Sequence, residues 1–455
     1  MTSHETWSGR AGFVLATIGS AVGIGSIWKF PYELGANGGS TFLFAYLFGL
    51  ILIVIPLMLA EFVIGRQGRG DPAFSLAQVA RAAGASPRWR AAGTLGVIAG
   101  FLILSFYSVI GGWTLGYALD VLVSGLPGAG AQAARERFQA FLAAPVPMTA
   151  FHAVFMASCA AIVARGVSGG IEVAMKALMP ALAALMLGLV AYSMLHGDID
   201  ATLRFLFAFD PRRLDAHTMI EALGLGFFSI GVGMGLMITY AGYARPDVSL
   251  VQVALVSVLA DTAISLLAGF AVFPIVFANG LDPAGGPGLV FESLPLAFAR
   301  MPFGVPAAVA FFVLLFIAAL ASAVSTLELM VATALRCTRL GRGTASVLTG
   351  LACFVAGIPT VLSFNVWADW HPLGAIPAFA QATFFDLIDG LTSNVMLPAG
   401  GLAIAIFAGW AIPAQRWVGG LEVRARTAML LRFALRWLVP GGIVLAGLAS
   451  LVLRS

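Results

Sequence analysis

GSAVGIGS, residues 19–26, interrupts the first long apolar segment of the chain, between GFVLATI and IWKFPY. Three of its residues are glycines and two are serines, and both residue types are weak helix formers. A second interruption, FFSIGVGMG at residues 227–235, places Gly231, Gly233 and Gly235 alternately inside another apolar run. Whether these two interruptions break their helices or only let them pack closely decides the fold.

Close helix packing and unwinding are the two explanations for these glycines. Small residues spaced four apart, such as Gly19 and Gly23, let membrane helices pack closely, and for a single pair this is the simpler explanation. The alternating glycines of residues 231–235 cannot all lie on one helical face, which favours unwinding. Unwound backbone at membrane depth persists only where it is buried in protein or lines a cavity. Its free amides and carbonyls would bind a carboxylate and cations.

The composition is that of a polytopic membrane protein. Of the 455 residues, 60% are hydrophobic and only 10% are charged. A helix crosses the bilayer with about 20 apolar residues, and by that measure the chain holds about eleven candidate spans, which predicts an all-α fold. The candidate spans cover residues 11–33, 41–65, 92–125, 149–164, 169–195, 218–243, 249–277, 303–335, 344–363, 384–411 and 430–453.

Arginines collect after the second, eighth and tenth candidate spans, in residues 66–90, 336–342 and 416–436. Positive residues stay preferentially on the cytoplasmic side. This pattern predicts a multi-pass protein of the inner (plasma) membrane with a cytoplasmic amino terminus and, with eleven spans, an external carboxyl terminus. The same arginines account for the net charge of +4, so the charge gives no support for a nucleic-acid partner. The expected partner around the spans is membrane lipid.

The two interruptions fall in the first and sixth spans, which hold corresponding places in two runs of five. Interrupted spans at matching positions of two halves indicate an inverted-repeat secondary transporter with its site near the bilayer midplane. We expect a single transmembrane domain over residues 1–455, with a first repeat at about 11–195, a second at about 218–411 and an extra helix at about 430–453.

Several stretches resemble the neurotransmitter:sodium symporter family, in its bacterial amino-acid transporter branch. They are WSGRAGFVLATIGSAVGIGSIWKFPYELGANGGSTFLFAY (7–46), PLMLAEFVIGRQGRG (56–70), GGWTLGY (111–117), FFSIGVGMGLMITYAGY (227–243) and DTAISLLAG (from 261). The resemblance covers essentially the whole chain. It implies a leucine-transporter-like fold and a Na⁺-coupled importer of amino acids that works by alternating access.

The resemblance also implies a substrate pocket built from both broken spans and from the third and eighth spans. Its residues are Ser20, Ala21, Gly25, Ile103, Tyr107, Phe228, Ser229, Gly231, Met234, Ser322 and Thr326. Gly23 stands where amine-carrying relatives have an aspartate, which favours a substrate that brings its own carboxylate. The apolar side chains predict a neutral, hydrophobic or aromatic amino acid. For Tyr107, a bond to a neighbouring backbone carbonyl is the alternative to binding the substrate carboxylate.

One or two sodium ions are implied in the same way. The first site falls on Ala21, Ser26, Ser229 and Asp261, together with the substrate carboxylate, and the second falls on Gly19, Val22, Ala318, Ala321 and Ser322. Oxygen ligands suit a hard cation. Ala321 replaces a hydroxyl residue and leaves the second site one ligand short, so a weak sodium site and another coupling ion both remain open.

Asp261, in ALVSVLADTAISLLAG, is a carboxylate at membrane depth and is therefore a functional-site hypothesis. Chloride-dependent relatives hold their anion with a glutamine where this chain has Leu225. We therefore expect Asp261 to supply the negative charge itself and transport to be independent of chloride. The alternative is a structural aspartate paired with a hydroxyl of Ser265 or Ser229.

Gate residues are also implied at the two ends of the site. Lys29 and Asp389 take the places of the outer gate pair, although membrane-interface snorkelling would also account for Lys29. At the inner gate Trp7 matches the family, whereas His4 and Arg336 replace the usual arginine and aspartate, and a Glu5–Arg336 pair is the suggested substitute. The remaining membrane-level carboxylates, Glu61 and Glu328, are expected to cap the broken helices.

An enzyme is not supported, because the histidines are scattered and the metalloprotease motif HExxH does not occur. The same scaffold would also suit two functions that differ from Na⁺-coupled import. One is transport coupled to H⁺ in place of Na⁺, and the second is amino-acid sensing without transport.

Overall fold

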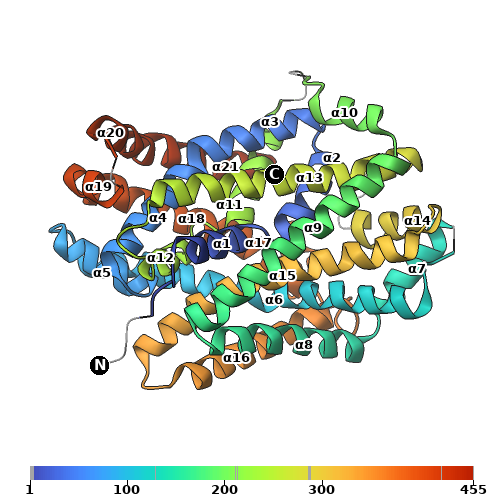
Figure 1. Cartoon of the computed structure of the whole chain (residues 1–455), viewed down its shortest axis with the longest axis horizontal. Coiled ribbons are helices and arrows are strands. Elements are labelled where there is room, and N and C mark those ends of the chain that lie inside the picture. Colours follow the sequence, from blue (N-terminus) through green and yellow to red (C-terminus); the bar gives the residue numbers. More distant parts are fainter. Residues whose placement is uncertain are drawn as a thin grey trace.

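The computed structural model describes residues 5–128, 130–210, 212, 214–284, 288–421 and 423–453. Every regular element within these ranges is a helix or a short helical turn, labelled α and η. The predicted all-α fold is therefore confirmed. Figure 1 shows the helices as one bundle, with the amino terminus at the same end as α5, α19 and α20.

The first half of the chain contains α1 (Arg10–Ala21), η1 (Gly25–Lys29), α2 (Phe30–Ala36), α3 (Ser40–Gly49), η2 (Leu50–Val54), α4 (Ile55–Gly68), α5 (Pro72–Ala82), η3 (Pro87–Trp89), α6 (Arg90–Ser124), α7 (Ala131–Leu142), α8 (Pro145–Ala164), η4 (Val167–Ile171) and α9 (Glu172–His196). The second half contains α10 (Ile199–Phe207), α11 (Ala216–Ile230), α12 (Leu236–Gly242), α13 (Leu250–Ala278), η6 (Leu289–Ser293), α14 (Leu294–Ala299), α15 (Gly304–Cys337), α16 (Arg342–Ser363), η7 (Pro377–Phe379), α17 (Phe384–Leu391), η8 (Thr392–Met396), α18 (Leu397–Ile406), η9 (Phe407–Ala411), α19 (Ala414–Leu421), α20 (Ala425–Phe433), η10 (Ala434–Leu438) and α21 (Val439–Leu453).

Among the described residues, 9 helices are long and apolar enough to cross a membrane, or 10 if the bent pair Arg10–Ala21 and Gly25–Ala36 is one span. The nine are Ser40–Gly68, Pro87–Ser124, Pro145–Ala164, Val167–His196, Leu250–Ala278, Gly304–Cys337, Arg342–Ser363, Phe384–Ala411 and Ala425–Gly447. The remaining expected span, at 218–243, appears as α11 and α12, and neither half is long enough alone because residues 231–235 separate them.

Both interruptions are real breaks in the helices. The axis bends by 50° between α1 and the helix that follows it, and Val22 takes an extended conformation there, with φ −79° and ψ 103°. In the second break Gly231, Gly233 and Gly235 have φ of 72°, 93° and 79°. Residues with a Cβ rarely adopt this left-handed region. Unwinding, and not helix packing, therefore explains the alternating glycines.

The second break is held by a carboxylate from a neighbouring helix. The amide of Gly233 donates to Glu61 Oε1 at 2.6 Å, and the amide of Met237 donates to Oε2 at 3.2 Å. Glu61 lies on α4 and is fully buried. It thus caps the amino end of α12, as expected from its position at membrane depth.

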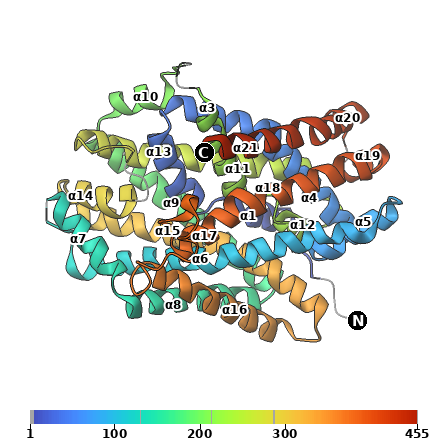
Figure 2. The ribbon, with the colours of Figure 1, turned by 180° about the vertical axis from the view of Figure 1, so that it is seen from behind.

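The broken helices lie inside the bundle, as Figures 1 and 2 show from opposite sides. Helix α1 packs against α9, α13 and α15, and α12 packs against α4. The long helices α6 and α15 pack against each other beside them. Non-helical backbone is thereby kept away from lipid, and both breaks face the same interior space.

Replacing Gly233 by alanine tests the second break. The new Cβ would lie 2.5 Å from the Leu397 carbonyl oxygen and 3.0 Å from the Gly401 nitrogen, at φ 93°. We expect a loss of about 1–3 kcal/mol from the backbone conformation alone, and more from the contacts. Thermal unfolding in detergent measures it. Gly188→Ala is the control, because nothing lies within 4 Å of its Cβ position, and equal melting temperatures for the two variants would contradict the assigned geometry.

Candidate functional site

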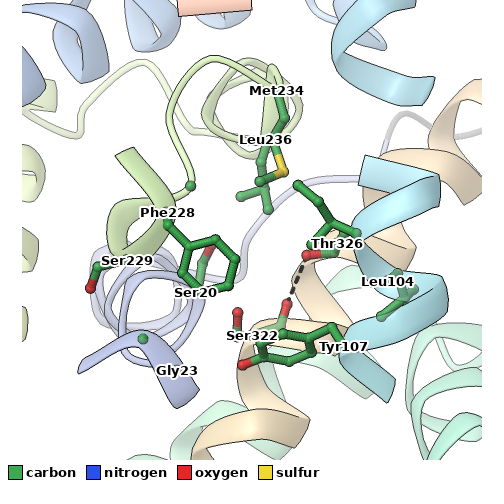
Figure 3. Close-up of a pocket in the computed structure, with 13 residues that line it drawn as sticks. Ser20, Gly23, Leu104, Tyr107, Phe228, Ser229, Met234, Leu236, Ser322 and Thr326 are labelled. Carbon is green, nitrogen blue, oxygen red and sulfur yellow. Dashed lines mark hydrogen bonds between the residues drawn. The ribbon is translucent and has the colours of Figure 1, made fainter. Parts of the chain in front are cut away.

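A small cavity lies where the two breaks meet α6 and α15. Its volume is about 30 Å³, and it is lined by Ser20, Gly23, Gly25, Ile103, Leu104, Tyr107, Phe228, Ser229, Gly231, Met234, Leu236, Ser322 and Thr326. Figure 3 shows these side chains arranged around the same space, with Phe228 near its centre and Met234 and Tyr107 on opposite sides. The cavity therefore draws its walls from four separate segments of the chain.

The structure brings together every predicted substrate residue except Ala21, which is buried beside Ser20 but does not line the cavity. Three lining residues were not among the predicted substrate residues: Gly23, which was singled out only for its missing side chain, and Leu104 and Leu236. Leu104 follows the predicted Ile103 on α6, and Leu236 begins α12 directly after the glycines. Neither leucine has a distinguishing sequence signal, since leucine is an ordinary apolar residue of membrane helices. The roles of the lining residues in binding remain predictions.

One side of the cavity is polar. The Tyr107 hydroxyl accepts a hydrogen bond from the backbone amide of Ile24 at 3.0 Å, so its own proton stays available to an anion. This differs from a bond to a carbonyl, which would have used that proton. The buried Ser20 hydroxyl has no partner within the described residues. An unpaired buried hydroxyl is costly, and this one lines the cavity, so it is available to bond a group that enters there.

Asp261 lies fully buried beside the cavity, surrounded by hydroxyl groups. Ser26 Oγ donates to Oδ1 at 2.5 Å, Ser229 Oγ donates to Oδ1 at 3.1 Å, and Tyr46 donates to Oδ2 at 3.1 Å. Ser26 and Ser229 are also 3.0 Å apart. Ser265, the other suggested partner, has an unbonded hydroxyl within the described residues. Tyr46 was missed, although a hydroxyl inside FLFAYLFGL could have indicated a buried polar partner.

The Asp261 cluster fits a hard cation. Among the described residues no basic side chain forms an ion pair with Asp261, and an isolated buried carboxylate is strongly unfavourable unless it is neutralised. The surrounding atoms are oxygens, which Na⁺ prefers to nitrogen and sulfur. The described residues contain no cluster of His, Cys, Asp and Glu suited to a transition metal. The predicted first sodium site therefore brings Ser26, Ser229 and Asp261 together.

The second predicted sodium site lies between the end of α1 and the middle of α15. Gly19 and Val22 come from the first break and Ala318, Ala321 and Ser322 come from α15, and these two helices pack together. The Ala321 carbonyl accepts a hydrogen bond from Ser325 Oγ at 3.1 Å. This oxygen is already engaged in a hydrogen bond, and the expectation that Ala321 is a poor ligand stays a prediction.

A larger cavity of about 480 Å³ adjoins the small one on the side away from the amino terminus and shares Tyr107 and Phe228 with it. Lys29, Asp386 and Asp389 also line it. Lys29 Nζ lies 5.0 Å from the centre of the Phe228 ring, and Asp389 accepts from Ser393 at 2.9 Å. No Lys29–Asp389 ion pair occurs among the described residues, so the two predicted gate residues face one cavity without closing it.

The amino-terminal side is closed by contacts of residues 5–10. Trp7 is buried, its ring nitrogen donates to the Tyr240 carbonyl at 3.0 Å, and its amide donates to the Tyr243 carbonyl at 3.1 Å. The Ser8 amide donates to Glu172 at 2.9 Å. These hydrogen bonds hold the segment that leads into α1 against α12 and α9.

The suggested Glu5–Arg336 pair is wrong. Glu5 pairs with Arg342 at 2.7 Å, and Arg336 pairs with Asp71 at 3.0 Å while its guanidinium lies 3.3 Å from the Phe74 ring centre. Arg336 therefore turns toward the start of α5. Burial raises the pKa of the Asp71 carboxyl, and the Phe74 amide and Arg336 oppose that shift. His4 lies outside the described residues.

Glu328 does not cap a broken helix, which corrects a second expectation. It is fully buried, accepts two bonds from Arg342, at 2.7 and 3.0 Å, and accepts one from the Tyr243 hydroxyl at 2.7 Å. Arg342 thus joins Glu328 on α15 to Glu5 in the amino-terminal segment. A buried carboxylate with an arginine in reach is better satisfied by that ion pair than by backbone amides.

Two membrane helices broken around one shared cavity, with a buried carboxylate beside it, define a secondary transporter of the broken-helix class. A model of the sodium:neurotransmitter symporter family matches residues 4–139 and 132–367. The chain therefore belongs to this family, whose members are sodium-dependent transporters and not enzymes. The family resemblance drawn from the sequence is confirmed.

Relatives and a solved structure agree with this assignment. The uncharacterised sodium-dependent transporter YhdH of Bacillus subtilis (strain 168) is 38% identical over 404 residues, which cover 88% of this chain and 86% of the relative. An uncharacterised sodium-dependent transporter of Haemophilus influenzae is 32% identical over 417 residues, or 90% of each chain. The crystal structure of MhsT in complex with L-phenylalanine is 40% identical, with a TM-score of 0.88, and the match covers 98% of this chain and 99% of MhsT.

A double-mutant cycle tests the partner of Glu5. Glu5→Gln alone should cost about 1 kcal/mol, because the side chain is 34% exposed. Arg342→Gln should cost about 3–5 kcal/mol, because it leaves Glu328 buried without its cation. The two changes should be coupled, whereas Glu5→Gln and Arg336→Gln should be additive. Unfolding free energies in detergent measure both cycles. Coupling of Glu5 to Arg336 and not to Arg342 would overturn the assignment.

Proposed function

We propose that this chain is a Na⁺-coupled symporter that imports neutral amino acids with hydrophobic or aromatic side chains by alternating access. The observation that carries the proposal is Asp261, a buried carboxylate that shares Ser229 with the substrate cavity and has no basic partner among the described residues. A sodium ion neutralises it, and the substrate carboxylate then meets a positive charge. Binding of each therefore strengthens binding of the other.

The lining of the cavity supports the substrate class. Ile103, Leu104, Phe228, Met234 and Leu236 contribute apolar side chains to the lining, whereas Ser20 and Tyr107 contribute hydroxyl groups. An α-amino acid has the same division, and Tyr107 has a proton to donate to its carboxylate. Methionine adapts to side chains of different shape. The similarity to MhsT, whose structure contains L-phenylalanine, supports an aromatic or large aliphatic substrate.

Chloride independence follows from the same carboxylate. Asp261 places one fixed negative charge beside the cation, so no anion is needed to balance it. Leu225 is buried and offers no polar group where chloride-dependent relatives have a glutamine. The second sodium site is the weaker one, because the Ala321 carbonyl accepts from Ser325.

The closed and open sides of the molecule support alternating access. The cavity of about 480 Å³ leads to the substrate residues from one side, while Trp7, Glu5 and Ser8 fasten the other. Opening the inner side requires these contacts to break. We assign the arginine-rich end of the bundle, which carries the amino terminus, to the cytoplasm. Lys29 and Asp389 act as the outer gate, and Trp7 acts as the inner one.

A thermal-shift screen of the twenty amino acids, with Na⁺ or with K⁺, tests the substrate class. Phenylalanine, leucine and methionine should raise the melting temperature in Na⁺, because a ligand that binds only the native state stabilises it. Glycine, glutamate and lysine should have little effect, because they leave the apolar side unfilled or bury a charge. Equal stabilisation by phenylalanine in K⁺ would contradict sodium coupling.

Asp261→Asn tests the ion site in proteoliposomes. Uptake of labelled phenylalanine should need a Na⁺ concentration at least about tenfold higher, because a contact between opposite charges in protein is worth several kcal/mol. Asp369→Asn, in an exposed loop, is the control and should change nothing. Wild-type uptake that follows a proton gradient without Na⁺ would indicate H⁺ coupling, and binding without uptake would indicate a sensor.

A further inference from the structure

An apolar groove runs along the outside of the bundle between α8 and α16 and shares no lining residue with the substrate cavity. Its volume is about 450 Å³, and Ala157, Ala160, Ala164, Val347, Leu351 and Phe354 are among the residues that line it. Figures 1 and 2 both show α8 and α16 side by side at the edge of the bundle.

The groove is narrow at its floor and open along its walls. A Cβ added to Gly350 would lie 3.2 Å from the Ala160 Cβ, so the two helices are in contact there. Val347 and Leu351 are 57% and 52% exposed. The small alanine side chains of α8 and the larger side chains of α16 thus leave an elongated apolar groove at membrane depth.

Two exposed arginines lie in the chain next to the end of α8 and the start of α16, which meet at one end of this groove. Arg165 directly follows the lining residue Ala164, and Arg339 precedes α16. Both are exposed, and neither has an ion-pair or hydrogen-bond partner on its side chain within the described part of the chain. Arg342 Nη1 donates to the Val163 carbonyl at 3.3 Å, which holds the start of α16 beside the end of α8.

The charged groups beside the start of α16 are already paired. Arg336 is bonded to Asp71, and Arg342 is bonded to Glu5 and Glu328. Glu5 lies beside Gly166, but its carboxylate is occupied by Arg342 and by the Val167 amide. The two exposed arginines therefore leave an uncompensated positive charge over an apolar groove.

The start of α16 adds to this positive character. Its first residues follow Gly341, which provides no side-chain cap, and nothing lies within 4 Å of the Cβ positions of Gly341 and Gly343. Uncapped amides at a helix amino terminus favour an anion such as phosphate. This open helix end lies at the same end of the groove as the two arginines.

We propose that the α8–α16 groove binds one anionic phospholipid from the leaflet on the amino-terminal side. An acyl chain lies in the groove, and the phosphate lies between Arg165, Arg339 and the start of α16. Basic pockets between membrane helices select anionic headgroups in this way. A second copy of the chain fits the face less well, because an isologous contact would bring the same free arginines of both copies together.

Titration of the delipidated chain in detergent with phosphatidylglycerol or phosphatidylcholine of equal chain length tests the proposal, with bound lipid counted by native mass spectrometry. We expect tight binding of phosphatidylglycerol only. The double variant Arg165→Gln, Arg339→Gln should bind it about thirty-fold more weakly, from the ordinary contribution of two arginines at a membrane surface. The corresponding double lysine variant should retain most of the binding.

The control for charge is Arg81→Gln, Arg88→Gln, which removes two exposed arginines of the α5–α6 region and should leave binding unchanged. The test of the groove is Ala157→Leu, Ala161→Leu at two exposed wall positions, which should weaken phosphatidylglycerol binding while both arginines remain. Equal loss in the control, or unchanged binding in the Arg165/Arg339 variant, would overturn the site. If the leucine variant converts a dimer to a monomer with lipid binding unaltered, the groove is a subunit contact and the proposal is wrong.

Discussion

Backbone polar groups inside a bilayer need partners from the protein itself, and this constraint governs the whole structure. The chain breaks two helices at membrane depth and then supplies what each break lacks. Glu61 binds the amides of Gly233 and Met237, and the Tyr107 hydroxyl binds the amide of Ile24. Each partner comes from an intact neighbouring helix. The breaks are therefore rigidly held features, and they can present groups to a ligand.

Two buried carboxylates beside the breaks have different tasks because their surroundings differ. Glu61 receives two backbone amides, and the positive end of α12 balances its charge. Asp261 receives only the hydroxyls of Ser26, Ser229 and Tyr46, which solvate it but carry no positive charge. Asp261 is therefore the carboxylate at which we propose a cation, and Glu61 is not. Ser229 both donates to Asp261 and lines the cavity, so the proposed ion site and the proposed substrate site share one residue.

The sequence predicted the spans, both breaks and nearly all of the cavity lining, because glycines inside apolar runs and a carboxylate at membrane depth have few explanations. Leu104 and Leu236 were not predicted as lining residues, since the sequence does not show whether a leucine in a membrane helix faces lipid or ligand. The ion-pair partners of Glu5, Arg336 and Glu328 were also not predicted. Arg342 lies far from Glu5 along the chain, and Asp71 lies far from Arg336. Glu328 and Arg342 are 14 residues apart but lie on different helices, so only the folded bundle sets which acid each arginine reaches.

The contacts of Arg342 with Glu5 and Glu328 indicate how the amino-terminal side of the bundle is held closed. Arg342 bonds the buried Glu328 and the half-exposed Glu5 with one guanidinium. Its bond to Glu328 is costly to break, since both partners are largely withdrawn from water, whereas the bond to Glu5 is easily replaced by water. The amino-terminal segment is therefore attached to a fixed arginine by a weak bond, and Trp7 adds two hydrogen bonds to backbone carbonyls. Such a fastening holds the closed side while leaving the start of α1 able to detach as a unit.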